Sequence, residues 1–138
     1  MASLIYNSAI DDMARGAIDY DTDSFKALLV TSAYTPNKDT DLKRSAVTNE
    51  VSGTGYTAGG VASVCTVTKD TANDKVTLSF AAVSWASSTI TARALVIYKS
   101  RGGASSADNL VAYNDFGSDV SSTAGTFSVA ASTITLQN

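Results

Sequence analysis

The chain has 138 residues, enough for one domain whose core needs no metal ion or disulfide. Hydrophobic residues make up 44% and charged residues only 17%, and Ser and Thr fill the difference. This composition excludes disorder and is typical of a surface suited to flat protein–protein contact. The net charge of -3 and a single adjacent basic pair, Lys43-Arg44, argue against nucleic-acid binding. No apolar run is long enough to span a membrane and no signal-peptide pattern is present, so we expect a protein made in the cytoplasm and not secreted.

The first 24 residues predict one short helix followed by an acidic connector. Asn7 or Ser8 is a suitable N-cap. The pattern places Asp11 and Asp12 in the first turn and Gly16 just past the C-terminus, positions that these residue types favour. An apolar stripe at three- and four-residue spacing consists of Tyr6, Ile10, Met13 and Ala17. So short a helix is marginal alone, so it must pack on a sheet or on a neighbour.

The rest of the chain predicts strands separated by turns. Residues 25–34 are almost continuously apolar, and residues 36–60 contain no strong strand, an excursion of a length that is often functional. Further strands are expected at residues 60–68, 76–85, 89–99, 110–116, 126–129 and 132–136, with a loop at 117–125. Alternation in the strongest strand places Ala92, Ala94, Val96 and Tyr98 on one face and Arg93, Leu95, Ile97 and Lys99 on the other.

These elements predict a mainly β fold. We expect a single antiparallel β-sandwich, jelly-roll-like, with a short N-terminal helix. Residues 1–24 form the helix and connector, and residues 25–138 form the sandwich, as one folding unit.

Two segments resemble ligand-binding motifs but lack residues that those motifs require. The acidic run containing Asp19, Asp21 and Asp23 lacks the Gly and Glu that an EF-hand requires, which leaves these three aspartates as weak metal candidates in what is otherwise a solvated connector. The glycine-rich residues 53–60 lead into a strand and lack the Gly-Lys-Ser/Thr ending of a phosphate-binding loop.

Catalytic residues are not indicated. The chain has no His, so the usual Ser-His-Asp triad and most general-base schemes are excluded. Glu50 is the only glutamate, and Cys65, within an alternating run, is expected to act as a small hydrophobic residue. The sequence therefore predicts a non-enzymatic protein with no cofactor.

Aromatic and apolar side chains supply the candidates for contact with other proteins. Trp85 follows a well-alternating strand and is interpreted as a core or interface anchor, in preference to a carbohydrate platform. The predicted interface candidates are Tyr6, Ile10, Met13, Tyr56 and Trp85.

Four segments, taken in order, resemble a family of small virion structural proteins of tailed bacteriophages. They are residues 17–36, residues 55–60, Trp85 with residues 89–98, and residues 110–117. The resemblance covers nearly the whole chain, and the order of the segments carries it more than any single motif.

This resemblance implies a virion component and, more specifically, a capsid decoration (cement) protein that stabilises the head lattice. The implied partners are the major capsid protein and other copies of the chain in closed symmetry, such as a trimer, with no nucleic acid and no membrane. The N-terminal segment, residues 36–60, or both would contact neighbouring subunits. The alternative is a tail- or fibre-associated module that binds host surface glycans through Trp85 or exposed tyrosines.

Overall fold

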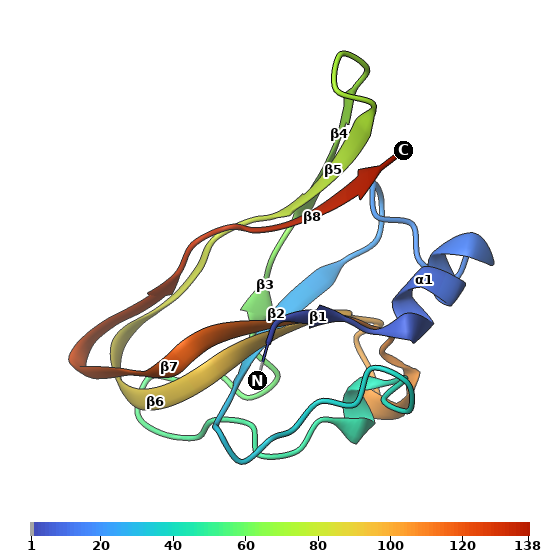
Figure 1. The fold of residues 1–138 in the computed structure, drawn as a ribbon. Helices are drawn as coiled ribbons and strands as arrows, with labels where there is room; N and C mark the ends of the chain where they lie inside the picture. The colour runs from blue at the N-terminus through green and yellow to red at the C-terminus, as the bar shows by residue number, and fades with distance from the viewer. Residues whose placement is uncertain (1) are drawn as a thin grey trace.

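The computed structural model describes residues 2–138, and it is mainly β, with two antiparallel sheets (Figure 1). One sheet has five strands in the order β1-β7-β6-β2-β3, and the other has three in the order β4-β5-β8. The strands are β1 (Leu4–Ile5), β2 (Phe25–Val30), β3 (Val61–Ala62), β4 (Cys65–Asp70), β5 (Lys75–Phe80), β6 (Val83–Lys99), β7 (Leu110–Val129) and β8 (Ser132–Gln137). The helical elements are α1 (Asn7–Ala14) and two 3-10 turns, η1 (Arg44–Ala46) and η2 (Ser105–Ala107). The predicted antiparallel sandwich with a short N-terminal helix is confirmed.

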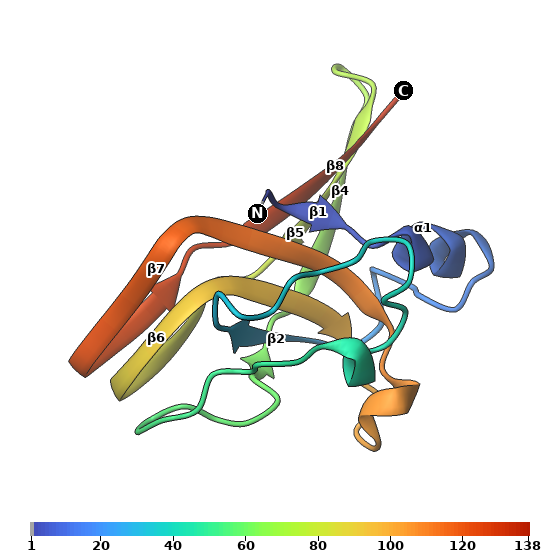
Figure 2. The same cartoon turned by 60° about the horizontal axis from the view of Figure 1, so that its bottom comes forward.

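One long two-stranded ribbon joins the two sheets. β5 leads into β6 and β7 leads into β8, so the two strands that pair in the smaller sheet continue as the two that pair in the larger one. Figures 1 and 2 show the ribbon bending back on itself at one end of the sandwich, so that β6 and β7 lie in one sheet and β5 and β8 in the other. The two strands of the ribbon therefore close this end of the sandwich.

The bend is built from irregular pairing around Ser88. The register between β6 and β7 shifts on both sides of Ser88, and such bulges bend strands. Ser88 is fully buried, and its Oγ lies 3.0 Å from the carbonyl oxygens of both Trp85 and Gly125 and 2.8 Å from Oγ of Ser122. This hydroxyl thus ties both strands of the ribbon together where they turn.

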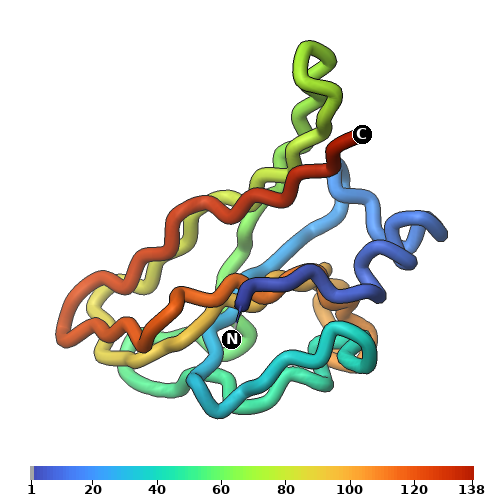
Figure 3. Tube along the Cα trace, viewed as in Figure 1, coloured from blue at the N-terminus to red at the C-terminus, as the bar shows by residue number. Residues whose placement is uncertain are grey.

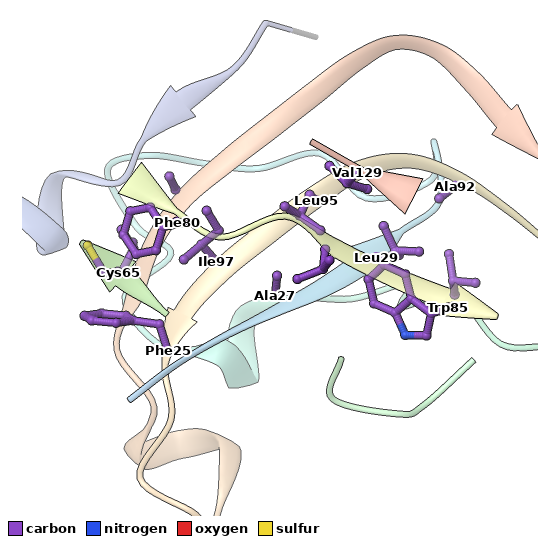
Figure 4. Close-up of a cluster of buried hydrophobic side chains, with 14 of the residues drawn as sticks. Phe25, Ala27, Leu29, Cys65, Phe80, Trp85, Ala92, Leu95, Ile97 and Val129 are labelled. Carbon is purple, nitrogen blue, oxygen red and sulfur yellow. The ribbon is translucent and has the colours of Figure 1, made fainter. Parts of the chain in front are cut away.

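Side chains of the two sheets form the main core. Phe25, Ala27 and Leu29 of β2 face Phe80 and other side chains of the smaller sheet across this core (Figure 4). Aromatic contacts reinforce it, because the ring of Phe25 stacks on Tyr20 at 5.6 Å and meets Phe80 edge-on at 5.4 Å. These three rings come from the acidic connector, β2 and β5, so they join separate elements in the core.

A second cluster covers the other face of the five-stranded sheet. It contains Tyr6, Leu28, Val30, Tyr34, Ala94, Val96, Tyr98, Leu110 and Tyr113, with Val47 packed against them. The excursion that follows β2 runs along this face (Figures 1 and 3). β2 is therefore buried on both sides, which explains why residues 25–34 are almost continuously apolar.

The excursion returns to the sheet at a position that only glycine can occupy. Gly60 has φ of 77°, and a Cβ atom there would lie 1.8 Å from the carbonyl oxygen of Ala27. Gly60 thus allows the backbone of the excursion to lie directly against the backbone of β2.

The helix differs from the prediction at its start. α1 begins at Asn7 with Tyr6 as N-cap and no capping side chain, so the Asn7 or Ser8 assignment is wrong. Asp11 and Asp12 consequently lie beyond the first turn, and Asp11 pairs instead with Arg15 at 2.8 Å. The missing cap is compensated by tertiary bonds: the N–H of Asn7 donates to Lys38 O.

Strand boundaries differ in three places because tertiary pairing overrides local pattern. The predicted strand 76–85 divides between β5 and β6, which lie in different sheets, and β6 continues without a break from Val83 to Lys99. Residues 117–125, predicted as a loop, belong to the continuous strand β7, which is held by pairing with β6. The alternating run 60–68 divides between β3 and β4, which lie in different sheets. The crossing is fixed by buried Ser63, whose N–H donates to Phe25 O and whose Oγ donates to Ala81 O.

The face assignment of the strongest strand holds for residues 94–99. Ala94, Val96 and Tyr98 join the outer cluster, whereas Leu95 and Ile97 join the main core. Ala92 was assigned to the same face as Ala94 but lies in the main core, because a register shift separates the two residues. A bulge of this kind leaves no mark in the alternation of side chains.

Candidate contact surfaces

Two of the predicted interface residues are core residues. Tyr6 is 0% exposed and Trp85 is 3% exposed, so neither is available for contact, which corrects their assignment. The hydroxyl of Tyr6 pairs with that of Tyr34 at 2.9 Å, and Trp85 lies between Tyr56 and Phe127. Trp85 is thus a core anchor, one of the two roles the sequence suggested.

Tyr56 and Met13 are partly buried and packed against the main core. The Tyr56 hydroxyl donates to Glu50 at 2.7 Å and accepts the N–H of Leu29 at 3.0 Å, which fixes the excursion to β2. Burial is the main cause that raises the pKa of Tyr56 far above its usual value. Ile10, on α1, is 54% exposed and is the one candidate that is mainly open to contact.

The acidic run is used for local structure. The Asp19 carboxylate accepts the N–H groups of Asp21 and Thr22, and Asp23 pairs with Lys99 at 2.7 Å. Burial opposes ionisation of Asp23, but hydrogen bonds from Lys99 and from the Asp19 N–H outweigh it and hold its pKa below the usual value. Within residues 2–138, no group of three or more His, Cys, Asp or Glu residues is placed to hold a metal ion.

The two residues considered for chemistry are engaged in packing or hydrogen bonding. Glu50 Oε1 accepts bonds from Tyr56 and from the Gly59 N–H at 2.6 Å. Cys65 is 7% exposed, and burial raises the pKa of its thiol to about 11. A buried thiol with so high a pKa is a poor nucleophile near neutral pH.

At the end opposite the bend, the main core is open. On the inner face of the smaller sheet, the next residue toward the open end is Val67 after Cys65 on β4, and Val76 after Leu78 on β5. Exposure rises along the same path, because Leu78 is buried whereas Val67 and Leu136 are each 37% exposed. Figure 1 shows why: the β4–β5 hairpin and the end of β8 project past the larger sheet.

This opening is an apolar groove of about 420 Å³. Its far wall is formed by the end of α1 and the acidic connector, and its lining residues are Met13, Gly16, Ile18, Asp19, Tyr20, Asp21, Val67, Val76, Leu78 and Leu136. Sequence reasoning missed the groove. Alternation along β4, β5 and β8 places their apolar residues on one face of the smaller sheet. No local sequence pattern indicates that this face extends beyond the larger sheet.

A second opening lies along one side of the sandwich. It has a volume of about 580 Å³, and its walls are β1 and the adjoining part of β7 on one side and residues 131–135 on the other. β1 and β8 are the edge strands of their sheets, so this side presents two unpaired backbone edges. Ile5 of β1, which is 37% exposed, adds apolar surface there.

Comparison with known proteins gives no relative on which a function can be based: the chain matches no family model, no curated protein and no solved structure. Among residues 2–138, no helix is both long enough and apolar enough to cross a membrane.

Proposed function

We propose that this chain is a structural protein of a tailed-bacteriophage virion, and specifically a capsid decoration protein that stabilises the head lattice. The observation that carries the proposal is the open end of the sandwich, where an apolar groove and the uncharged edge of β8 lie together. Apolar side chains and unpaired backbone edges are surfaces that another protein covers well. The resemblance of four segments to phage structural proteins supplies the setting.

The proposed partners are the major capsid protein and other copies of this chain. A small single domain fits this role, because each of many copies on a lattice needs only a modest contact and avidity supplies the rest. The low share of charged residues, 17%, reduces the desolvation cost of such contacts.

A binding assay with phage heads tests the proposal. Labelled protein is added to heads of a related tailed phage that lack decoration, and the mixture is sedimented and viewed by negative stain. We expect saturable, regularly spaced binding on the head and heads that resist heating better. Binding confined to tails or fibres, or no binding at all, would contradict the decoration role.

The alternative glycan-binding role loses its main residues. Trp85 is buried and the Tyr56 hydroxyl is bonded on both sides, so neither offers a free aromatic face with an available hydroxyl. A glycan array is the direct check, and we expect no specific binding. A saturable hit that is weakened by substitution of Phe116 or Tyr56, the two partly buried aromatic residues, would favour the tail or fibre role instead.

A further inference from the structure

The strand β8 is paired on one side only. It forms one edge of the three-stranded sheet, with β5 as its neighbour. The N–H of Asn138 donates to Asp74 O, which sets the phase of the ladder. Hydrogen-bonded pairs alternate with non-bonded pairs in antiparallel sheets. The backbone groups of Ile134 and Leu136 therefore face β5.

The residues between them face outward. The N–H and C=O groups of Thr133, Thr135 and Gln137 point away from β5, and no strand within residues 2–138 pairs with them. All three side chains are exposed. A row of free donors and acceptors on an extended strand is a template for one more strand.

The composition of this edge does not protect it from pairing with another strand. Residues 120–138 contain no Asp, Glu, Lys, Arg or Pro, which are the residues that protect edges from pairing. By contrast, the opposite edge of the same sheet, β4, carries Lys69 and Asp70. The edge strands of the larger sheet, β1 and β3, have two residues each. From residue 120 on, the outer side of β7 also lacks a strand partner within residues 2–138 and is uncharged, but it lies in the irregularly paired ribbon. β8 is thus the long, uncharged edge that follows a regular ladder, with six consecutive residues paired to β5.

We propose that β8 pairs with β8 of a second copy of this chain, in a two-fold antiparallel contact that joins two three-stranded sheets into one. The inference rests on the proposed function, because it names the surface by which copies of an assembly module meet. It replaces the trimer implied by the resemblance, since a contact between identical edges closes as a dimer.

A second copy fits this edge for two reasons. With the axis at Thr135, Thr133 lies opposite Gln137 of the partner subunit, so every outward backbone group meets its complement and no charges face each other. The two-fold axis also keeps the inner faces on the same side of the joined sheet. Val76 and Leu136 of each copy then form one apolar strip beside the contact. The contact covers the β8 edges of both copies at once, whereas an unrelated strand would cover the β8 edge of one copy only.

The variant Thr135→Pro tests the contact. Proline removes the outward N–H at the centre of the edge and leaves the bonds between β8 and β5 in place. Thr135→Val keeps the N–H and controls for loss of the hydroxyl. Lys69→Pro is the matched control on the β4 edge, because residue 69 also directs its N–H away from β5.

Sedimentation velocity over a range of concentrations is the measurement, with circular dichroism as the check on folding. We expect dimers for the wild type, Thr135→Val and Lys69→Pro, and a folded monomer for Thr135→Pro. A wild type that is a trimer, or still monomeric near ~1 mM, where binding would be no stronger than about 4 kcal/mol, overturns the inference. So does a Thr135→Pro protein that still dimerises.

Failure of this inference can be told apart from failure of the proposed function. Each variant is also tested for binding to phage heads. A wild type that dimerises through β8 but ignores heads supports the edge contact and contradicts the decoration role. A monomer that binds heads regularly supports the decoration role and contradicts the edge contact.

Discussion

The two ends of the sandwich are finished in different ways. At the bend, both strands of the ribbon pass from one sheet to the other, the Ser88 hydroxyl ties them together, and Trp85 packs beside Phe127. At the other end, the smaller sheet outreaches the larger one and leaves Val67 and Leu136 more than a third exposed.

We infer from this difference that the closed end contributes to folding stability and the open end to association with other molecules. The closed end buries the side chains of Trp85 and Phe127 within the chain, so changes to them should reduce folding stability. The open end leaves apolar side chains and a backbone edge for another molecule, so changes there should reduce association and affect folding little. The following experiments test that separation.

The largest loss of stability is expected for Trp85→Ala at the closed end. The side chain is almost fully buried, and truncating such a residue costs about 3–5 kcal/mol of unfolding free energy. Chemical denaturation followed by circular dichroism measures it. Trp85→Phe is the matched control and should cost less than ~1.5 kcal/mol, because the buried indole N–H has no hydrogen-bond partner within residues 2–138. Equal losses for both variants would contradict this account.

A comparison of two leucines on the inner face of the smaller sheet tests the difference directly. Leu78 is 3% exposed, so Leu78→Ala should cost about 2–5 kcal/mol. Leu136 is partly exposed in the groove, so Leu136→Ala should cost about 1 kcal/mol or less, while weakening dimer formation. If the two variants lose the same stability in the monomer, the groove is not an open surface.

Removal of the Ser88 hydroxyl should give an intermediate loss. The single hydroxyl proton of buried Ser88 is shared between the carbonyl oxygens of Trp85 and Gly125, and Ser88→Ala removes this donor at a cost of about 1–3 kcal/mol. Ser84→Ala, an exposed position on the same strand, should change stability by less than about 0.5 kcal/mol. Thermal unfolding of both variants measures the difference, and a Ser88→Ala protein as stable as the wild type would show that the bend does not need this hydroxyl.

The smallest effect is expected from Cys65, the last buried residue of β4 before the core opens. Burial raises the pKa of its thiol from 9.0 to about 11, so in that range the folded protein holds a proton that the unfolded chain has lost. Stability should therefore fall as the pH rises from about 9 to about 11. Burial also raises the pKa of all six tyrosines above their usual value of 10, which adds a further loss of stability above pH 10. Cys65→Ser should therefore remove the decline between about pH 9 and pH 10 and keep the decline above it. An unchanged pH profile in Cys65→Ser would indicate that the thiol is not buried as described.

Local pattern was sufficient for the type of most elements. The apolar run beginning at Phe25 predicted a strand, and β2 forms there because its side chains are buried on both faces of the sheet. Gly16 was predicted to follow the helix, and its φ of 76° at that place shows the left-handed conformation that glycine tolerates. These features depend on a few adjacent residues, which is why the sequence alone reveals them.

Long-range pairing decided the features that the pattern missed. Residues 117–125 read as a loop because they are rich in Gly, Ser and Thr, yet they form a strand because β6 lies beside them. Tyr6 and Trp85 appeared suited to an interface, yet other segments cover both. Neither outcome depends on the residues next to them in the chain.

For the contact surfaces too, the sequence determined one part and the tertiary structure another. Composition by itself determined that the molecule is poor in charge and that residues 120–138 carry none, so it indicated a protein suited to contact with others. Only the tertiary structure decided where that contact can occur, because β8 becomes an edge, and Val67 and Leu136 become exposed, through the unequal reach of two sheets. Alternation determines which side chains share a face of a strand, but the position of the other sheet determines whether that face is covered.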